Sequence, residues 1–373
     1  MRVSLLLRTA APVFTLITAV LCVLAFAVPA RAYDNVALAR RAYEKLILPE
    51  YARFAEMART FAERTEALCR APSTAALADA RAASKAALLA WGRIEPIRFG
   101  PIAARQRLER LLFFPDPHHV ADRQIARLLS AKNDDAITEE RLAGASVAVQ
   151  GFGAVDVVLY GPGSDALANT DPASSFRCRY VAALAAGIAD IAADVQSEWS
   201  GAYARTWLKP GGDNTAYLSP EETTQALYRA YVTELDVLRL HRLAPMLGAD
   251  GKTSRSPPLL RHSGLALRFI LAGIDGARNM LGENGFLADD PSANEKQQAA
   301  RAILESAATD LGFATRAGEA AEALSAGGEE SDENLRGKLI AMGAALDNVD
   351  AVSRPTLGEL TGQTLGFNSL DGD

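Results

Sequence analysis

The sequence lacks the short motifs that mark most enzymes. It contains no GxSxG elbow, no P-loop, no GxGxxG turn and no HExxH helix, which excludes the common hydrolase, nucleotide-binding and zinc-protease chemistries. Histidine is scarce, with four in 373 residues. His118 and His119 are neighbours in a proline-containing segment, where adjacent side chains point apart and are usually solvated. We expect His241 and His262 to make surface or interhelix hydrogen bonds.

Runs of basic residues are also missing. The chain has 39 Lys and Arg against 45 Asp and Glu, a net charge of -6, and no basic cluster is interleaved with aromatic residues. Nucleic-acid binding is therefore excluded as a function class. The apolar fraction of 49% and the charged fraction of 23% are typical of a folded globular protein. A length of 373 residues exceeds what one hydrophobic core usually supports, which predicts two domains.

The longest apolar run lies near the N-terminus. A basic start and an apolar stretch over residues 13–28 precede Ala30-Arg31-Ala32. This pattern predicts a secretory signal peptide over residues 1–32 that is cleaved after Ala32. An uncleaved membrane anchor is the alternative, whereas lipidation at Cys22 is disfavoured because the preceding residue is not small. We therefore expect a periplasmic protein whose membrane contact is made only through the cleaved signal peptide.

Cysteine is as rare as histidine, and one of the three cysteines, Cys22, would be lost with the signal peptide. The remaining pair, Cys69 and Cys178, would enter an oxidising compartment, which favours a disulfide between them. Two separate buried thiols are the alternative. A bridge would join residues 109 positions apart (178 minus 69), worth about 4 to 5 kcal/mol in the chain-entropy model. Two cysteines without CxxC spacing give a zinc site little support.

Apolar residues recur every three or four positions along the mature chain, which predicts long amphipathic helices. Three stripes are continuous: Val181, Leu184, Ile188, Ile191, Val195 and Trp199; Leu227, Tyr231, Leu235 and Leu238; and Leu335, Leu339, Met342, Leu346 and Val349. Asp171-Pro172 predicts one helix start, and Ser219-Pro220-Glu221-Glu222 predicts another with a capping box. The β-like run over residues 157–160 is too short to indicate a sheet.

A cluster of helix breakers, Lys-Pro-Gly-Gly-Asp-Asn-Thr, separates two helix-rich stretches of similar size. We expect an all-α protein with two packed helical domains, each resembling a four-helix bundle. The predicted N-terminal domain covers residues 33–207, the linker 208–219 and the C-terminal domain 220–373. The breaker-rich segment at 248–258 is expected to be a loop inside the second domain.

Three segments resemble one known family. They are WGRIEPIRFGP over residues 91–101, GFGAVDVVLYG over residues 151–161, and the ending GFN-x-x-DGD over residues 366–373. Together with Cys178-Arg179-Tyr180 at the start of a long helix, they resemble the imelysin family, exported bacterial proteins named for a metallopeptidase and linked to iron uptake. The likeness extends over most of the mature chain.

The family's characteristic motif is altered in this sequence. The family pattern is GxHxxE, in which His and Glu three positions apart share one helix face and address one cation. Gly153 stands in place of the His, and Asp156 in place of the Glu. The resemblance also places Glu95 and Arg98 near the same site. It thus implies a cofactor- or ligand-binding site of these four residues, with Glu95 and Asp156 as weak oxygen ligands for a divalent or iron cation.

Three interpretations of this cluster stay open. Gly153 could simply permit close helix packing while Asp156 pairs with Arg98 as a buried ion pair. A ligand or ion site could use other residues. A metal-dependent peptidase is the third, although hydrolysis requires an activated water that no His/Glu pair here can hold. The sequence favours a non-enzymatic periplasmic protein that binds an unidentified small ligand or envelope partner in iron uptake, with the metal-dependent peptidase as the alternative.

Overall fold

The computed structural model describes residues 33–116, 118–169, 172–248, 259–288, 293–325 and 329–363. The predicted signal peptide, the Asp171 cap, most of the 248–258 segment and the GFN-x-x-DGD ending lie outside these ranges. Every regular element in the described ranges is helical, which confirms the all-α fold class. The α-helices are α2 (Asn35–Ala42), α3 (Leu48–Arg70), α4 (Thr74–Ile94), α5 (Arg107–Leu111), α6 (Val120–Ala131), α7 (Glu139–Ala143), α8 (Gly151–Val155), α9 (Pro172–Ser200), α10 (Ala202–Leu208), α11 (Pro220–Asp236), α12 (Ala244–Leu247), α13 (Ala266–Leu281), α14 (Glu295–Leu324) and α15 (Glu329–Thr361).

Three π-helical segments extend or follow these helices: Tyr43–Ile47, Asp156–Tyr160 and Val237–Leu243. The first joins α2 to α3, the second continues α8, and the third links α11 to α12. Such segments are rare and frequently occur at functional sites. Short 3₁₀ turns, Gly100–Gln106, Asp134–Ile137, Val147–Val149 and Ser164–Ala168, complete the described regular structure.

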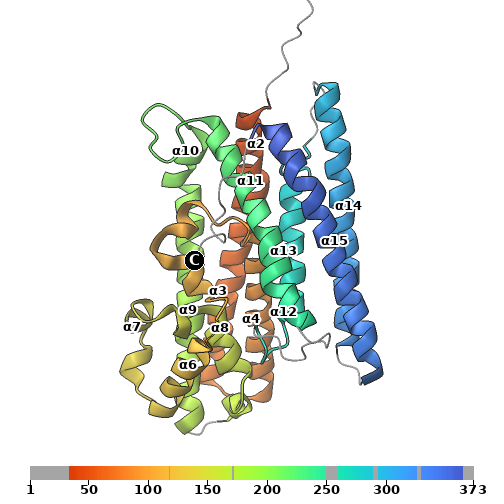
Figure 1. Ribbon diagram of the computed structural model, residues 1–373. Coiled ribbons are helices and arrows are strands. Elements are labelled where there is room, and N and C mark those ends of the chain that lie inside the picture. The colour runs from red at the N-terminus through yellow and green to blue at the C-terminus, as the bar shows by residue number, and fades with distance from the viewer. Residues whose placement is uncertain are drawn as a thin grey trace, which may run out of the picture.

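The long helices lie side by side (Figure 1). The packed pairs run in the order α9, α3, α4, α13, α14 and α15, and α11 lies against α13 and α15. The short helices α6, α7 and α8 gather beside α9 at one end of the molecule (Figure 1). All three predicted apolar stripes are buried, in α9, in α11 with its π-helical extension, and in α15. Burial of these stripes is what aligns the helices, because isolated helices gain little stability from propensity alone.

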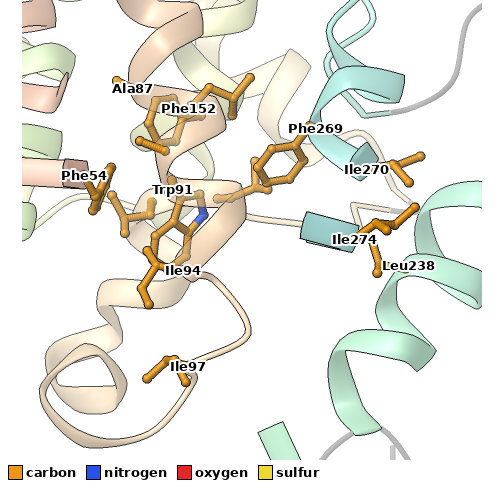
Figure 2. Close-up of a cluster of buried hydrophobic side chains, with 14 of the residues drawn as sticks. Phe54, Ala87, Trp91, Ile94, Ile97, Phe152, Leu238, Phe269, Ile270 and Ile274 are labelled. Carbon is orange, nitrogen blue, oxygen red and sulfur yellow. The ribbon is translucent and has the colours of Figure 1, made fainter. Parts of the chain in front are cut away.

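One hydrophobic core runs through both halves of the chain. Trp91 of α4 packs against Phe54 of α3, with ring centroids 5.4 Å apart, and Phe269 of α13 lies on the other side of this region (Figure 2). Gly92 allows the close approach of α4 to α13, since a Cβ there would lie 2.9 Å from the Cβ of Ala272. The division into two domains with a linker at 208–219 stays a prediction.

The predicted disulfide is present. Cys69 near the end of α3 and Cys178 in α9 are bonded, with their Cα atoms 5.6 Å apart. The bridge closes a sequence separation of 109 residues and ties together two of the most extensively packed helices of the N-terminal half.

One predicted helix start needs a correction. Helix α11 begins at Pro220 as expected, but the side chain of Ser219 makes no capping hydrogen bond. The carboxylate of Glu222 instead accepts from the backbone N–H of Leu218 at 2.6 Å, one residue earlier than in a capping box. The reciprocal geometry of a capping box is therefore not formed.

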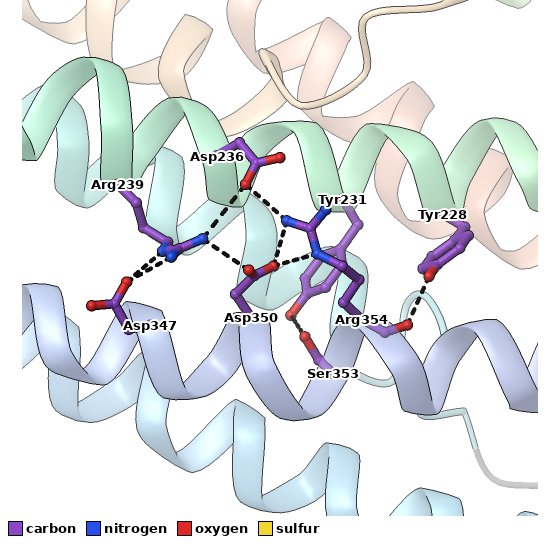
Figure 3. Close-up of polar contacts among 8 residues, drawn as sticks. All are labelled: Tyr228, Tyr231, Asp236, Arg239, Asp347, Asp350, Ser353 and Arg354. Atoms are coloured by element: carbon purple, nitrogen blue, oxygen red, sulfur yellow. Dashed lines mark hydrogen bonds and ion pairs between the residues drawn. The ribbon is translucent and has the colours of Figure 1, made fainter. Parts of the chain in front are cut away.

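A network of ion pairs fixes α15 against α11 and the π-helical segment Val237–Leu243 (Figure 3). Arg239 donates to Asp347 at 2.7 Å and to Asp350 at 2.8 Å. Arg354 donates to Asp236 at 2.8 Å and to Asp350 at 2.8 Å. Because Arg239 lies three residues before Arg242, this network also anchors the segment that carries Arg242 into the core.

Candidate functional site

Glu95 lies at the end of α4, where Pro96 cannot continue the helix. Its side chain is buried, and both carboxylate oxygens are hydrogen-bonded. Arg98, three residues later, donates to Oε1 at 2.8 Å. Arg242 from the third π-helical segment donates through Nη2 to both oxygens at 2.6 Å. The carboxylate is thus held between two guanidinium groups, one local and one 147 positions away.

A second carboxylate lies on the other side of Arg242. Glu234 of α11 has no solvent exposure, and its Oε1 lies 3.7 Å from Nη1 of Arg242. Neither oxygen of Glu234 has a hydrogen-bond partner. Helix α13 makes room for this side chain with Gly273, where a Cβ would lie 2.6 Å from Oε1. Burial raises the pKa of Glu234 to about 8, with Glu95 adding to the rise while Arg242 and Arg98 oppose it. Glu234 is therefore mostly protonated at neutral pH.

Arg242 is fully enclosed in this cluster. It is 3% exposed, and its guanidinium lies over the ring of Phe269, 4.4 Å from the centroid. Its Nε and Nη1 have no hydrogen-bond partner, and neither does Nε of Arg98. Within the described residues, seven buried side-chain N or O atoms lack a partner, and five of them belong to Arg98, Arg242 and Glu234. Native proteins rarely leave such atoms unsatisfied, so their concentration at one place points to a functional role.

A cavity of ≈ 290 Å³ opens beside this cluster, and we refer to it as the Glu95 cavity. Its polar lining comes from both halves of the chain, and its apolar lining comes mainly from the segment between α5 and α6. The lining residues are Glu95, Arg98, Leu108, Glu109, Leu112, Phe113, Phe114, Pro115, Val237, His241 and Arg242.

Asp156 and Gly153 line a second, smaller cavity of ≈ 60 Å³. This cavity shares residues 112–114 with the Glu95 cavity, so the two are adjacent. Asp156 is buried and accepts from the backbone N–H groups of His262 at 3.0 Å and Ser263 at 2.8 Å. It therefore fixes the loop that leads into α13.

One interpretation of the sequence was that these residues only support the fold. Both contacts that it predicted prove wrong. Asp156 does not pair with Arg98, because Arg98 donates to Glu95 and Asp156 accepts from backbone N–H groups. Gly153 does not permit close helix packing, because a Cβ at that position would meet no atom within 4 Å. The space beside Gly153 opens toward the smaller cavity.

The four residues predicted from the family resemblance thus divide into two pairs. Glu95 and Arg98 line the Glu95 cavity, whereas Gly153 and Asp156 line the smaller one. The donor set does not fit a transition metal, because Glu95 is occupied by two arginines and Asp156 by two N–H groups. In the part of the chain that the structure describes, no three His, Cys, Asp or Glu residues are grouped as metal ligands would be.

Sequence reasoning missed Arg242 and Glu234, although a signal was available. Tyr231, Glu234, Leu238 and Arg242 are spaced by three, four and four, so both charged residues lie on the stripe that the apolar residues define. Ionisable residues on a buried helix face require a partner. Here Arg242 lies beside both Glu95 and Glu234.

The arrangement defines a helical protein with a buried Glu–Arg cluster beside a small cavity. The chain matches the family model named imelysin over residues 47–348, and it belongs to the imelysin family. Among curated proteins, none matches the chain.

Two solved structures share the fold. An imelysin-like protein from Psychrobacter arcticum 273-4 has a TM-score of 0.70 at 19% identity, with 90% of this chain and 100% of that chain covered. A protein from Parabacteroides distasonis ATCC 8503, named "putative iron-regulated protein A precursor", has a TM-score of 0.67 at 15% identity, with 90% and 97% covered. Among the helices described here, none has both the length and the apolar character needed to cross a bilayer.

Proposed function

We propose that this protein is an exported, non-enzymatic member of the imelysin family that binds a small ligand in the Glu95 cavity and acts in iron uptake. The observation that carries the proposal is the concentration of five unpartnered buried polar atoms on Arg98 and Arg242, which line that cavity, and on Glu234, which lies behind Arg242. A purely structural ion-pair cluster would gain stability by satisfying these atoms, whereas a binding site holds its polar groups in a fixed arrangement at the cost of stability.

The altered motif supports a role without hydrolysis. Activating a water for peptide hydrolysis requires a metal or a free general base. Asp156 already accepts two backbone N–H groups, and position 153 offers no side chain. The iron-related role is supported by the name of the Parabacteroides distasonis protein, which is called iron-regulated, and by the family resemblance. Export is supported by the residue pattern of the first 32 positions.

The biochemical part is tested by elemental analysis of protein purified without chelator, together with a casein hydrolysis assay in added zinc. We expect neither stoichiometric zinc or iron nor hydrolysis. Stoichiometric metal that is lost in Asp156→Ala, accompanied by hydrolysis lost in the same variant, would show that the protein is a metallopeptidase.

The cellular part is tested by deleting the gene and growing the strain with and without an iron chelator. We expect slower growth under iron limitation, restored by the wild-type gene but not by one encoding Arg98→Met. Equal growth of the deletion and parent strains at limiting iron would contradict the role in iron uptake.

A further inference from the structure

The polar groups that face the Glu95 cavity are mainly hydrogen-bond donors. Arg98 and Arg242 both line it, and His241 joins them from the same π-helical segment as Arg242. Glu95 also lines the cavity, but each of its oxygens already accepts from a guanidinium at 2.6 to 2.8 Å. Guanidinium groups have no acceptor capacity, so a ligand that hydrogen-bonds to Arg98 or Arg242 in the cavity must supply an acceptor.

The charges that line the Glu95 cavity also favour an electron-rich, acceptor-carrying ligand. Arg98 and Arg242 carry two positive charges against one on Glu95. Glu234 lies behind Arg242 and does not line the cavity. Glu109 is the other acid in the lining, and it lies at the exposed rim, where solvent screens its charge. A cation entering the cavity would be repelled by two arginines within hydrogen-bond distance of Glu95, whereas an anion would be attracted.

The remaining walls are apolar. Leu108, Leu112, Phe113, Phe114, Pro115 and Val237 supply them. A cavity of ≈ 290 Å³ lies at the lower end of the range for small-molecule sites, and such sites combine an apolar lining with a few oriented polar groups.

We infer that the Glu95 cavity takes a small organic anion, with its carboxylate against Arg98 and Arg242 and its apolar body against the phenylalanine-containing wall. The inference rests on the proposed function, because it names the ligand class of the same cavity. Carboxylates are among the groups whose geometry the planar arginine guanidinium matches.

Three probes of similar shape separate the possibilities. Benzoate, benzamide and benzylamine carry an anionic, a neutral and a cationic group on the same ring. We expect calorimetric titration of the mature protein at pH 7 to show benzoate binding at least 10-fold more tightly than benzamide, and no heat for benzylamine. Equal or tighter binding of benzylamine would overturn the inference.

Variants locate the binding. Arg98→Met keeps the side-chain length and leaves Glu95 paired with Arg242, so the fold should survive, and we expect benzoate affinity to fall about 10- to 100-fold. Leu108→Trp, which fills the cavity, should abolish binding. Arg64→Met removes an exposed arginine of α3 outside the cavity and should leave affinity unchanged. Melting curves of all three variants verify folding.

The outcomes distinguish the two proposals. Benzoate affinity unchanged in a folded Arg98→Met protein would refute the anion inference. If benzamide or benzylamine binds best and Leu108→Trp abolishes that binding, the cavity is a ligand site and only the anion inference fails. If none of the three probes binds, the anion inference fails, and the growth experiment decides the role in iron uptake on its own.

Discussion

The buried acid Glu234 makes the stability of this protein depend on pH in a way that one substitution should remove. Burial raises its pKa from the ordinary 4.5 to about 8, so the folded protein keeps a proton that the unfolded chain loses. Between these two values the folded state binds more protons than the unfolded state, and the free energy of unfolding therefore falls as pH rises. This loss in the free energy of unfolding is absent below about pH 4.5 and complete above about pH 8.

The size of the effect follows from the same numbers. At 1.36 kcal/mol per pH unit, the interval from 4.5 to about 8 corresponds to about 4 to 5 kcal/mol. Glu234→Gln keeps the shape of the neutral acid and cannot ionise. We therefore expect Glu234→Gln to match the wild type near pH 4.5 and to exceed it by about 4 to 5 kcal/mol at pH 9.

Urea denaturation at pH 4.5, 7 and 9 measures the difference between the two proteins. The matched control is Glu56→Gln, which changes an exposed glutamate of α3 and should leave the pH profile of the wild type unaltered. Parallel profiles for wild type and Glu234→Gln would refute the reasoning, because they would mean that Glu234 ionises in the folded protein at no cost.

Three further outcomes are expected. Replacing Cys69 and Cys178 together by alanine should lower the free energy of unfolding by about 4 to 5 kcal/mol in urea denaturation, and a loss under about 1 kcal/mol would contradict the loop-closure argument. Gly153→His should change the free energy of unfolding by less than about 1 kcal/mol, because the new side chain starts in open space. A loss typical of overpacking, about 1 to 3 kcal/mol, would show that the space is not available. Mass spectrometry of the exported protein should give Tyr33 as the N-terminal residue, and a chain that begins at any other residue would contradict the predicted cleavage.

The family resemblance predicted which residues belong to the site, but the surroundings of those residues could not be predicted from the sequence. The family resemblance predicted that Glu95 and Arg98 lie close together, and the structure shows Arg98 donating to Glu95. The same resemblance predicted that Gly153 stands in place of the family's His. The sequence did not show that a side chain at 153 would meet open space, because that depends on where residues 112–114 and 259–262 pack.

The three helices and their buried faces could be predicted from the sequence. The three apolar stripes predicted helices that proved buried along those faces, because helical periodicity is a property of neighbouring residues and needs no tertiary contact to be read. The disulfide was predictable for a different reason: with Cys22 predicted to leave with the signal peptide, the other two cysteines allow only one intramolecular pairing.

The partners of the buried charges were decided by the tertiary structure alone. Arg242 reaches Glu95 across 147 positions, and Asp156 reaches the N–H groups of His262 and Ser263 across more than 100. These contacts require α4 to pack against α13 at Gly92 and the π-helical segment Val237–Leu243 to turn Arg242 inward. Such long-range contacts follow from how whole helices pack, and no local pattern of residues specifies which distant charges will meet.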